Sequence, residues 1–434
     1  MEYLEALDWL YNIRRFGPDR TLKPTFKILE LLGKPQNSFK SIHVGGTNGK
    51  GSTSAIIASI LEAAGFKVGL YTSPHLEVFN ERVKVNGVMI SDSDVAKLIT
   101  RIKPLFEEML SLPQPMPLRF FDVVTAMAFK YFEEREVDFA VLEVGLGGRL
   151  DATTTVNPLV SVITNIGYEH VNILGPTLVD IAGEKAGIIK PCRILVTATD
   201  NESVFDVFKR KANALNCRVI RVGYDTSYKK LYSNMTHQTF RLESINGEYP
   251  KLEIPLLGDH QVINAATAVA AVESLKYYEI IIGRESIEEG LKKVYWPGRL
   301  EIIKTHPLVV LDCAKDAEAT EAVRKSIEKD FTYGKLISVV SMSSDKNIPG
   351  MMMNICSISD YLILTKHSVM NRAADTDRLA AETEKYGKPY EIIVNREDAF
   401  KRALELAKPE DMVLIIGSVF LAGDARSYLL NVAK

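Results

Sequence analysis

Hydrophobic positions near the start of the chain predict a strand, a glycine-rich turn, a helix and a second strand. A largely apolar run covers residues 41–44, a helical pattern covers about 51–64, and a second apolar run covers 68–71. This order favours a parallel sheet, because parallel neighbours need a crossover between them. Further strands are expected at 139–144, 160–164 and 194–197, with helices at 123–136 and 178–186.

The pattern changes near residue 228. Short alternating runs flank Asn246-Gly247, a dipeptide typical of hairpin turns, so a β-rich segment is expected at 228–255. After Trp296-Pro297-Gly298, a candidate hinge, the alternation of strands and helices restarts. Helices are expected at 261–275, 287–294, 317–329, 379–386 and 398–407, and strands at 308–311, 336–340, 361–364, 392–394 and 413–416. A chain of 434 residues exceeds the usual size of one domain, so we expect domains at 1–296 and 297–434.

Composition excludes several classes of protein. The formal net charge is −2 and no basic block is visible, so a nucleic-acid partner is not expected. Four scattered cysteines without a C-x-x-C pair suggest neither a zinc cluster nor a disulfide framework, and they fit a reducing compartment. The acidic first residues lack the features of a signal peptide, and no apolar run is long enough to span a bilayer. We therefore expect a cytoplasmic monomer without a membrane partner.

The segment 45–53 between the first strand and helix has the context of a phosphate-binding loop. Its glycines let backbone N–H groups converge on phosphate oxygens, and the following helix N-terminus favours negative charge. Lys50 would neutralise phosphate charge, and Ser52 or Thr53 would face a metal ion. The strict P-loop spacing fails, because Val44 occupies the first glycine position and Gly51 follows the lysine. A turn that merely needs glycine is the alternative.

Glu143 ends the apolar run 139–144 and precedes a glycine-rich loop. A carboxylate there lies at the carboxyl edge of the sheet, where open α/β sheets bind ligands. A solvated strand end is the alternative.

Several longer motifs, in order along most of the chain, resemble the dihydrofolate synthase/folylpolyglutamate synthase family of the ATP-dependent Mur-ligase superfamily. They are the loop 45–52, Thr72-Ser73-Pro74-His75-Leu76 with Phe79-Asn80-Glu81-Arg82, the run 143–153, Glu169-His170, the run 184–190, His260-Gln261 with Asn264-Ala265-Ala266, Pro297-Gly298-Arg299, Asp345-Lys346-Asn347 and the run 417–421.

The resemblance implies a fold and an activity. The fold would be a P-loop parallel-sheet ATPase domain of the Mur-ligase type over 1–296, followed by a smaller Rossmann-like glutamate-ligase domain over 297–434. The enzyme would use ATP and Mg²⁺ to phosphorylate the carboxylate of a pterin or folate acid. L-Glutamate would then displace phosphate to form an amide, yielding dihydrofolate or a longer glutamate tail.

The resemblance also implies roles for individual residues. The nucleotide would contact Gly46, Thr47, Asn48, Gly49, Lys50, Gly51, Ser52, Asn264, Arg299, Asp312 and Lys315. Metal ions would be organised by Ser52, Ser73, Glu143, His170 and a carbamylated Lys185. The acid substrate would meet Arg82, Arg119, Phe121 and Asp151. The residues closest to catalysis would be Lys50, Lys185 and His170.

Structural alternatives remain open for several of these side chains. His170 would be a backbone-bonded histidine, Lys185 a solvated or ion-paired lysine, Asn264 a polar residue on an Ala-rich helix, and Arg299 an interdomain ion pair.

Three segments depart from the family pattern. Asp312-Cys313-Ala314-Lys315-Asp316-Ala317 stands where Asp-Gly-Ala-His-Asn-Pro is usual. Arg119 stands where Thr is usual, and Asp151-Ala152-Thr153-Thr154 stands where Asp-Ala-Thr-Asn is usual. The change at 312–317 is compatible with retained anion binding, with altered specificity for the amine, or with lost activity. Arg119 is compatible with a more anionic acid substrate or with a position on the protein surface. The rivals are therefore a Mur-type ligase for another acid or amino acid, a nucleotide-binding regulator with a degenerate second domain, and a P-loop kinase.

Overall fold

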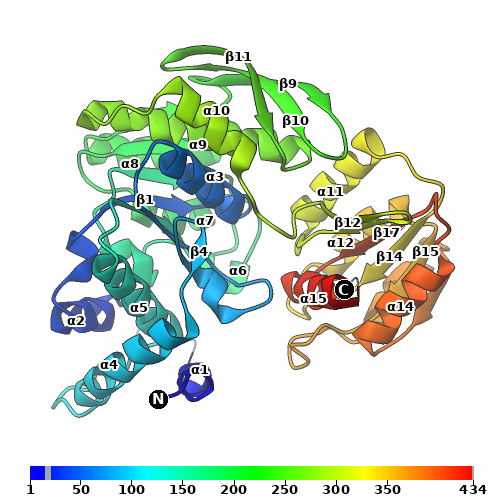
Figure 1. The fold of residues 1–434 in the computed structure, drawn as a ribbon, viewed down its shortest axis with the longest axis horizontal. Helices are drawn as coiled ribbons and strands as arrows, with labels where there is room; N and C mark the ends of the chain where they lie inside the picture. The colour runs from blue at the N-terminus through cyan, green and yellow to red at the C-terminus, as the bar shows by residue number, and fades with distance from the viewer. Residues whose placement is uncertain (15–20, 433–434) are drawn as a thin grey trace.

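The computed structural model describes residues 1–14 and 21–432. Two α/β units lie side by side, and a small antiparallel sheet lies beside the first of them (Figure 1). Within the described part of the chain, none of the helices combines the length and the apolar character that crossing a bilayer requires.

The first unit is built on a sheet in the order β4-β3-β2-β5-β1-β6-β7-β8. Its strands are β1 (Lys40–Gly45), β2 (Val68–Tyr71), β3 (Val83–Val85), β4 (Val88–Met89), β5 (Phe139–Glu143), β6 (Val160–Ile163), β7 (Ile194–Thr197) and β8 (Arg218–Arg221). Strands β2, β5, β1, β6, β7 and β8 are neighbours in this order and pair in parallel. Strands β3 and β4 form an antiparallel edge beside β2.

Helices cover both faces of this sheet. They are α1 (Tyr3–Asn12), α2 (Lys23–Leu31), α3 (Lys50–Ala63), α4 (Asp92–Leu110), α5 (Phe120–Glu134), α6 (Val171–Leu174), α7 (Leu178–Lys185), α8 (Glu202–Ala214), α9 (Asp259–Glu273) and α10 (Arg284–Lys293). Phe139 and Val141 of β5 pack with α3, α9 and α10, and Ala140 and Leu142 pack with α1, α2, α4 and α5. Strand β5 therefore buries both of its faces, as its continuous apolar sequence predicts.

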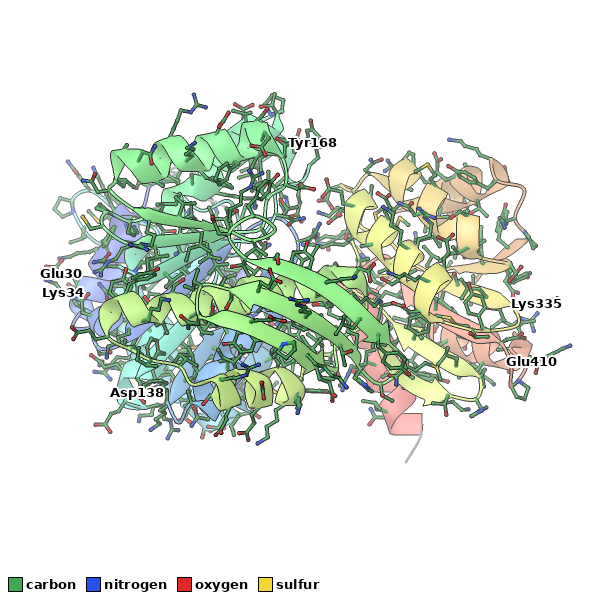
Figure 2. All side chains as sticks on the ribbon, turned by 90° about the horizontal axis from the view of Figure 1, so that it is seen from above. Glu30, Lys34, Asp138, Tyr168, Lys335 and Glu410 are labelled. Carbon is green, nitrogen blue, oxygen red and sulfur yellow. The ribbon has the colours of Figure 1, made fainter. Side chains whose placement is uncertain are left out.

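The predicted β-rich segment is a separate sheet in the order β11-β10-β9. Its strands are β9 (Ser227–Ser233), β10 (Gln238–Ser244) and β11 (Gly247–Ile254). The hairpin turn is Ile245-Asn246, one residue before the predicted Asn246-Gly247, because Gly247 already pairs with Ser244. Seen from above, these strands reach towards the second unit (Figure 2). Lys230 on β9 makes an ion pair of 2.6 Å with Asp330 of that unit.

The second unit has its own sheet, in the order β12-β13-β17-β14-β15-β16. Its elements are β12 (Glu301–Thr305), β13 (Leu308–Leu311), α11 (Ala317–Asp330), β14 (Leu336–Val340), α12 (Ile348–Ile358), β15 (Tyr361–Leu364), α13 (Thr376–Glu384), β16 (Tyr390–Ile392), α14 (Arg396–Leu406), β17 (Met412–Ile416) and α15 (Val419–Val432). Helices α11, α12 and α13 pack on one face, and α14 and α15 on the other. The division at residues 296 and 297 stays a prediction, supported by this change of sheet.

The sequence pattern predicts buried strands better than it predicts amphipathic helices and edge strands. Strands β2, β7, β13, β14 and β15 have the expected bounds, whereas α1, α2, α4, α8, α12 and α15 were not predicted. The edge strand β16 covers Tyr390–Ile392 rather than 392–394. Edge strands bury one side only, so their hydrophobic signal is short and the register is weakly marked.

We expect Gly290→Ala to destabilise the packing beneath the phosphate loop. A Cβ at Gly290 in α10 would lie 2.4 Å from the Cα atom of Ile60 in α3, so the two helix backbones would have to separate. The free energy of unfolding should fall by about 1–3 kcal/mol, a typical cost of overpacking. Urea denaturation followed by circular dichroism measures it.

Gly183→Ala in α7 is the matched control, because nothing lies within 4 Å of the added Cβ. It should be neutral or stabilising by up to about 1 kcal/mol, since alanine is the better helix former. Equal stability of the Gly290→Ala variant and the wild type would contradict the close crossing of α3 and α10.

Candidate active site

A cavity of about 2120 Å³ lies where the loops after the strands of both sheets meet. The loops after β1, β2, β5 and β6 line one side, and those after β13, β14 and β17 line the other. The structure brings every predicted site residue to its wall: Gly46, Thr47, Asn48, Gly49, Lys50, Gly51, Ser52, Ser73, Arg82, Arg119, Phe121, Glu143, Asp151, His170, Lys185, Asn264, Arg299, Asp312 and Lys315.

The glycine loop connects β1 to α3 in a conformation that only glycine fits. Gly46 and Gly49 have φ of 134° and 81°, and added Cβ atoms would lie 1.9 Å from Thr164 Oγ1 and 2.3 Å from Asn264 Oδ1. Gly49 has no side chain to cap α3, so the first N–H groups of the helix are left without a side-chain cap, and the first residues of the helix line the cavity. This is the geometry of an anion-binding helix N-terminus.

Two lysines converge on one carbonyl oxygen of this loop. Lys50 Nζ donates to Gly46 O at 3.1 Å and to Thr47 O at 2.9 Å, and Lys185 Nζ donates to Gly46 O at 2.6 Å. Burial lowers the pKa of both ammonium groups. For Lys185, burial and then the neighbouring Lys50 lower the pKa to about 7.

The position of Lys185 is fixed by close backbone packing. A Cβ at Gly148 would lie 2.8 Å from the carbonyl oxygen of Lys185, and Arg149 N donates to Glu184 O at 2.8 Å. Lys185 is 3% exposed, so it is not a solvated lysine. Its neighbour Glu184 instead pairs with Arg149 at the surface.

Glu143 lies at the end of β5 and is 5% exposed, so the alternative of a solvated strand end is wrong. Its Oε2 accepts a hydrogen bond from Ser73 N at 2.9 Å, which joins two of the predicted metal-site residues. Burial raises the pKa of this carboxyl, and Lys50 opposes that effect.

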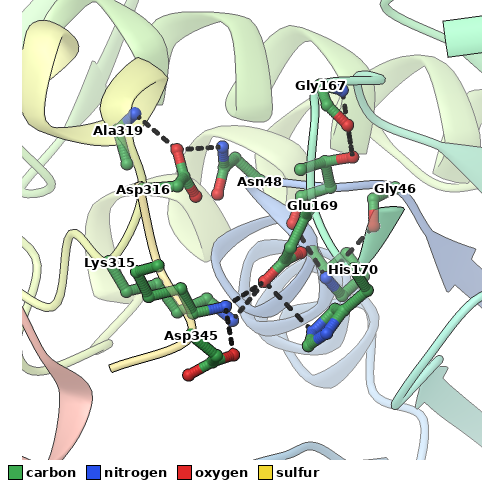
Figure 3. Close-up of polar contacts among 12 residues, drawn as sticks. Gly46, Asn48, Gly167, Glu169, His170, Lys315, Asp316, Ala319 and Asp345 are labelled. Atoms are coloured by element: carbon green, nitrogen blue, oxygen red, sulfur yellow. Dashed lines mark hydrogen bonds and ion pairs between the residues drawn. The ribbon is translucent and has the colours of Figure 1, made fainter. Parts of the chain in front are cut away.

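His170 begins α6 with a φ of 53° and is partly exposed to the cavity. Burial lowers its pKa to about 4, so the imidazole is neutral near pH 7 and can offer a lone pair. Figure 3 shows His170 and Glu169 beside the glycine loop.

The donor set of the predicted metal site fits a hard cation. No group of three or more His, Cys, Asp or Glu side chains in residues 1–14 and 21–432 is placed to hold a metal ion. Mg²⁺ is usually held by one or two carboxylates together with phosphate oxygens and water. The Glu143 carboxylate and the Ser52 and Ser73 hydroxyls supply such oxygens beside the loop. Lys185 fits only as an oxygen ligand, because its ammonium form would repel a cation.

Asp151 holds the loop after β5 in place. Its Oδ2 accepts from Gly145 N and Leu146 N, each at 3.1 Å, and its Oδ1 accepts from the backbone and hydroxyl of Thr153. The Thr153 hydroxyl donates its hydrogen bond to Asp151. His43 Nε2, which lies 2.7 Å from Thr153 Oγ1, must therefore donate to that oxygen. His43 is fully buried in β1, a position that sequence reasoning did not single out.

The arginines expected near the acid substrate are already engaged with protein groups. Arg119 makes a bidentate ion pair with Asp122 at 2.8 and 2.9 Å. The Thr25 hydroxyl also donates a hydrogen bond to the Asp122 carboxylate. The Arg119 side chain is 20% exposed, so it is part of the cavity wall rather than a free surface residue. Arg82 Nε donates to His75 Nδ1 at 2.9 Å and is buried beside Phe120.

The second unit contributes Arg299, Asp312 and Lys315. Arg299 Nη1 donates to Gly298 O at 2.8 Å, a contact within the hinge, and the Asp312 carboxylate accepts from Leu300 N and Ala314 N. Lys315 Nζ lies 3.0 Å from Glu169 of the first unit. Asn264 Nδ2 donates to Gln261 Oε1 in the first unit, so it faces Gly49 rather than solvent.

Glu169 and Lys346 also belong to the site, although sequence reasoning gave them no role. Both line the cavity, and Lys346 Nζ is 3.6 Å from the Glu169 carboxylate. Their motifs, Glu169-His170 and Asp345-Lys346-Asn347, were visible in the sequence. The sequence did not show that these two motifs meet between the two units, because that contact depends on the tertiary structure.

Comparison with known proteins agrees over nearly the whole chain. Residues 119–272 match the Mur ligase middle domain, and residues 298–419 match the Mur ligase glutamate ligase domain. The dihydrofolate synthase/folylpolyglutamate synthase of Bacillus subtilis is 34% identical, over 98% of this chain and 99% of that protein. The corresponding Mycobacterium tuberculosis protein is 32% identical, over 94% of this chain and 90% of that protein.

Solved structures show the same arrangement. The Mycobacterium tuberculosis folylpolyglutamate synthase complexed with ADP superposes with a TM-score of 0.92 at 31% identity, covering 98% of both chains. Escherichia coli FolC in complex with DHPP and ADP gives a TM-score of 0.89 at 27% identity, covering 100% of this chain and 99% of that one. The chain belongs to the dihydrofolate synthase/folylpolyglutamate synthase family of Mur ligases.

Proposed function

We propose that this chain joins L-glutamate to the carboxylate of a pterin or folate acid at the expense of ATP, through an acyl phosphate. The family makes the chain an ADP-forming acid–amino-acid ligase. One observation carries the proposal furthest: Lys50 on the glycine loop and Arg299, Asp312 and Lys315 of the second unit line a single cavity. The relatives complexed with ADP and with DHPP and ADP support the two substrate classes.

The chemistry requires the cavity to bring anions together. The substrate carboxylate attacks the γ-phosphorus of ATP and ADP leaves, and the glutamate nitrogen then attacks the acyl carbon and phosphate leaves. Lys50 and the N-terminus of α3 offset negative charge on the phosphates, which lowers the barrier because these groups are already in place. The loop bearing Arg82 and the helix start bearing Arg119 lie on the part of the wall where we place the acid.

The site would also use Mg²⁺, which supplies positive charge that neutralises the phosphates during transfer. Ser52, Ser73, Glu143 and His170 would hold it, together with a carbamylated Lys185. Carbamylation converts the free amine and CO₂ into a carbamate and a proton, so a cation becomes an oxygen ligand. The buried, partly deprotonated Lys185 is suited to this reaction, because only the free amine is nucleophilic.

The residues at 119 and 315, which differ from the family pattern, give little reason to expect an acid substrate other than a pterin or folate. Asp122 balances the charge of Arg119, and Glu169 balances that of Lys315. Neither cation therefore requires a more anionic substrate by itself. A pterin-type acid remains our proposal, as do a monomeric state and a cytoplasmic location.

We expect phosphate release from ATP to require both an acid and L-glutamate. Dihydropteroate, tetrahydrofolate or neither is supplied with ATP and Mg²⁺, each with and without L-glutamate, and phosphate and amide are measured. We predict turnover when a pterin acid and L-glutamate are both present, and none when only one of the two is supplied. Equal phosphate release in all mixtures, or none in any of them, would contradict the proposal.

Lys50→Ala provides the negative control for that assay. Removing a preorganised charge at transferring phosphate typically lowers kcat by about 100- to 1000-fold. Lys27→Ala removes an exposed lysine that pairs with Glu30, so it should match the wild type.

Lys185→Ala should lose nearly all activity, and acetate or formate should restore part of it. Because the pKa of Lys185 is lowered to about 7, the free amine grows from a minor fraction at pH 6 to the major form at pH 8. Carbamylation by ¹³C-labelled bicarbonate should therefore increase over this range. A ¹³C carbamate resonance in the wild type, absent from Lys185→Ala, measures it.

Lys209→Ala, an exposed lysine on α8, is the matched control and should retain both the resonance and the activity. Wild-type activity in Lys185→Ala would rule out the carbamate role.

A further inference from the structure

A group of charges joins the two units directly over the glycine loop. Glu169 belongs to the loop between β6 and α6, Lys315 follows β13, and Lys346 follows β14. Lys315 Nζ lies 3.0 Å and Lys346 Nζ 3.6 Å from Glu169 Oε1. We call these three residues the Glu169 cluster. Figure 3 shows the Glu169 carboxylate between the glycine loop and Lys315 of the second unit.

Glu169 depends on the second unit for its ion-pair partners. Its side chain is only 6% exposed, and a buried carboxylate destabilises a fold unless it is paired. His170 Nε2 is 3.5 Å away, but it belongs to the same loop as Glu169 and cannot join the two units. Among the residues that the structure describes, the lysines that pair with the Glu169 carboxylate are Lys315 and Lys346, both from the second unit, and Lys50 of the glycine loop acts on it from farther away.

The contacts around the cluster are close and include two carboxylates of the second unit, Asp316 and Glu318. Asn48 Nδ2 of the glycine loop donates to Asp316 Oδ1 at 3.2 Å, and the same oxygen caps α11 through Ala319 N. A Cβ at Gly167 would lie 2.1 Å from Glu318 Oε2, so the loop before Glu169 packs against the start of α11. These contacts set how near the units approach, and the cluster adds to the ion pairs that Lys230, Lys329 and Arg426 also make between the units.

We propose that Lys315 is a positioning residue that holds the second unit over the glycine loop by pairing with Glu169, with Lys346 as a second and weaker tie. Where it concerns turnover, the inference rests on the proposed function, in which the second unit brings the amine to the acyl phosphate. Its structural part stands alone, because it concerns the contact between the two units and does not involve turnover.

Lys315 acts through Glu169 in this account rather than on the phosphates directly. Removing either partner should therefore produce the same defect, and removing both should add little. The side chain of Lys315 is 34% exposed, so salt should weaken the pair in the wild type.

The test compares Lys315→Met, Glu169→Gln and the double variant. Each should scatter X-rays as a more extended particle than the wild type in the absence of nucleotide. Each should also raise the KM for L-glutamate by about tenfold, the effect of losing one charge-assisted hydrogen bond, while the ADP dissociation constant changes by less than about threefold. The double variant should resemble the single variants.

Lys325→Met is the matched control, since Lys325 is an exposed lysine on α11 that pairs with Glu321. It should equal the wild type in scattering and KM. Lys315→Arg should restore most of the wild-type behaviour, which distinguishes loss of charge from a folding defect.

Two results would overturn the inference. Wild-type scattering and KM in both single variants would show that the pair does not position the second unit. A loss of ADP affinity in Lys315→Met that persists in the Glu169→Gln background would show that Lys315 binds phosphate directly. The scattering comparison needs no turnover, so absence of ligase activity would refute the proposed function without deciding this one.

Discussion

Two buried ammonium groups donate to one carbonyl oxygen, and much of the site follows from that contact. Lys50 and Lys185 meet at Gly46 O because the glycine loop is pressed between Thr164 and Asn264. Burial lowers the pKa of both ammonium groups, and Lys50 lowers that of Lys185 further, to about 7. Two lysines held at one point of the loop are placed to accept phosphate, and Lys185 loses its proton readily.

The fold makes this contact by joining distant parts of the chain at one sheet edge. Parallel strands place the loops after β1, β2, β5 and β6 together, and close glycine packing at Gly148 fixes the end of α7 beside them. The second sheet then supplies Arg299, Asp312 and Lys315 from the opposite side. The proposed site therefore takes side chains from both units, which gives charge pairs between them, such as Glu169 with Lys315, a direct influence on how its two halves are held together.

The sequence predicts what is local or strongly patterned. Short apolar runs predict β2, β7 and β13 to the residue because both faces are buried, and the motif order places all of the proposed site residues on one cavity. It does not reveal that Arg119 is held by Asp122, that Asp151 is enclosed by four hydrogen bonds, or that His43 supports it through Thr153. Those contacts join residues far apart in the chain or depend on the direction of side chains. The spacing of hydrophobic residues in the sequence carries no information about distant contacts or about side-chain direction.

Transfer of an oxygen atom from the acid to phosphate tests the central claim most directly. A pterin acid labelled with ¹⁸O in its carboxylate is turned over with ATP and L-glutamate, and the inorganic phosphate is examined by mass spectrometry. An acyl phosphate requires one carboxylate oxygen to leave with phosphate, so we predict labelled phosphate in proportion to the amide formed. Unlabelled phosphate accompanying amide formation would contradict activation of the carboxylate by the γ-phosphoryl group.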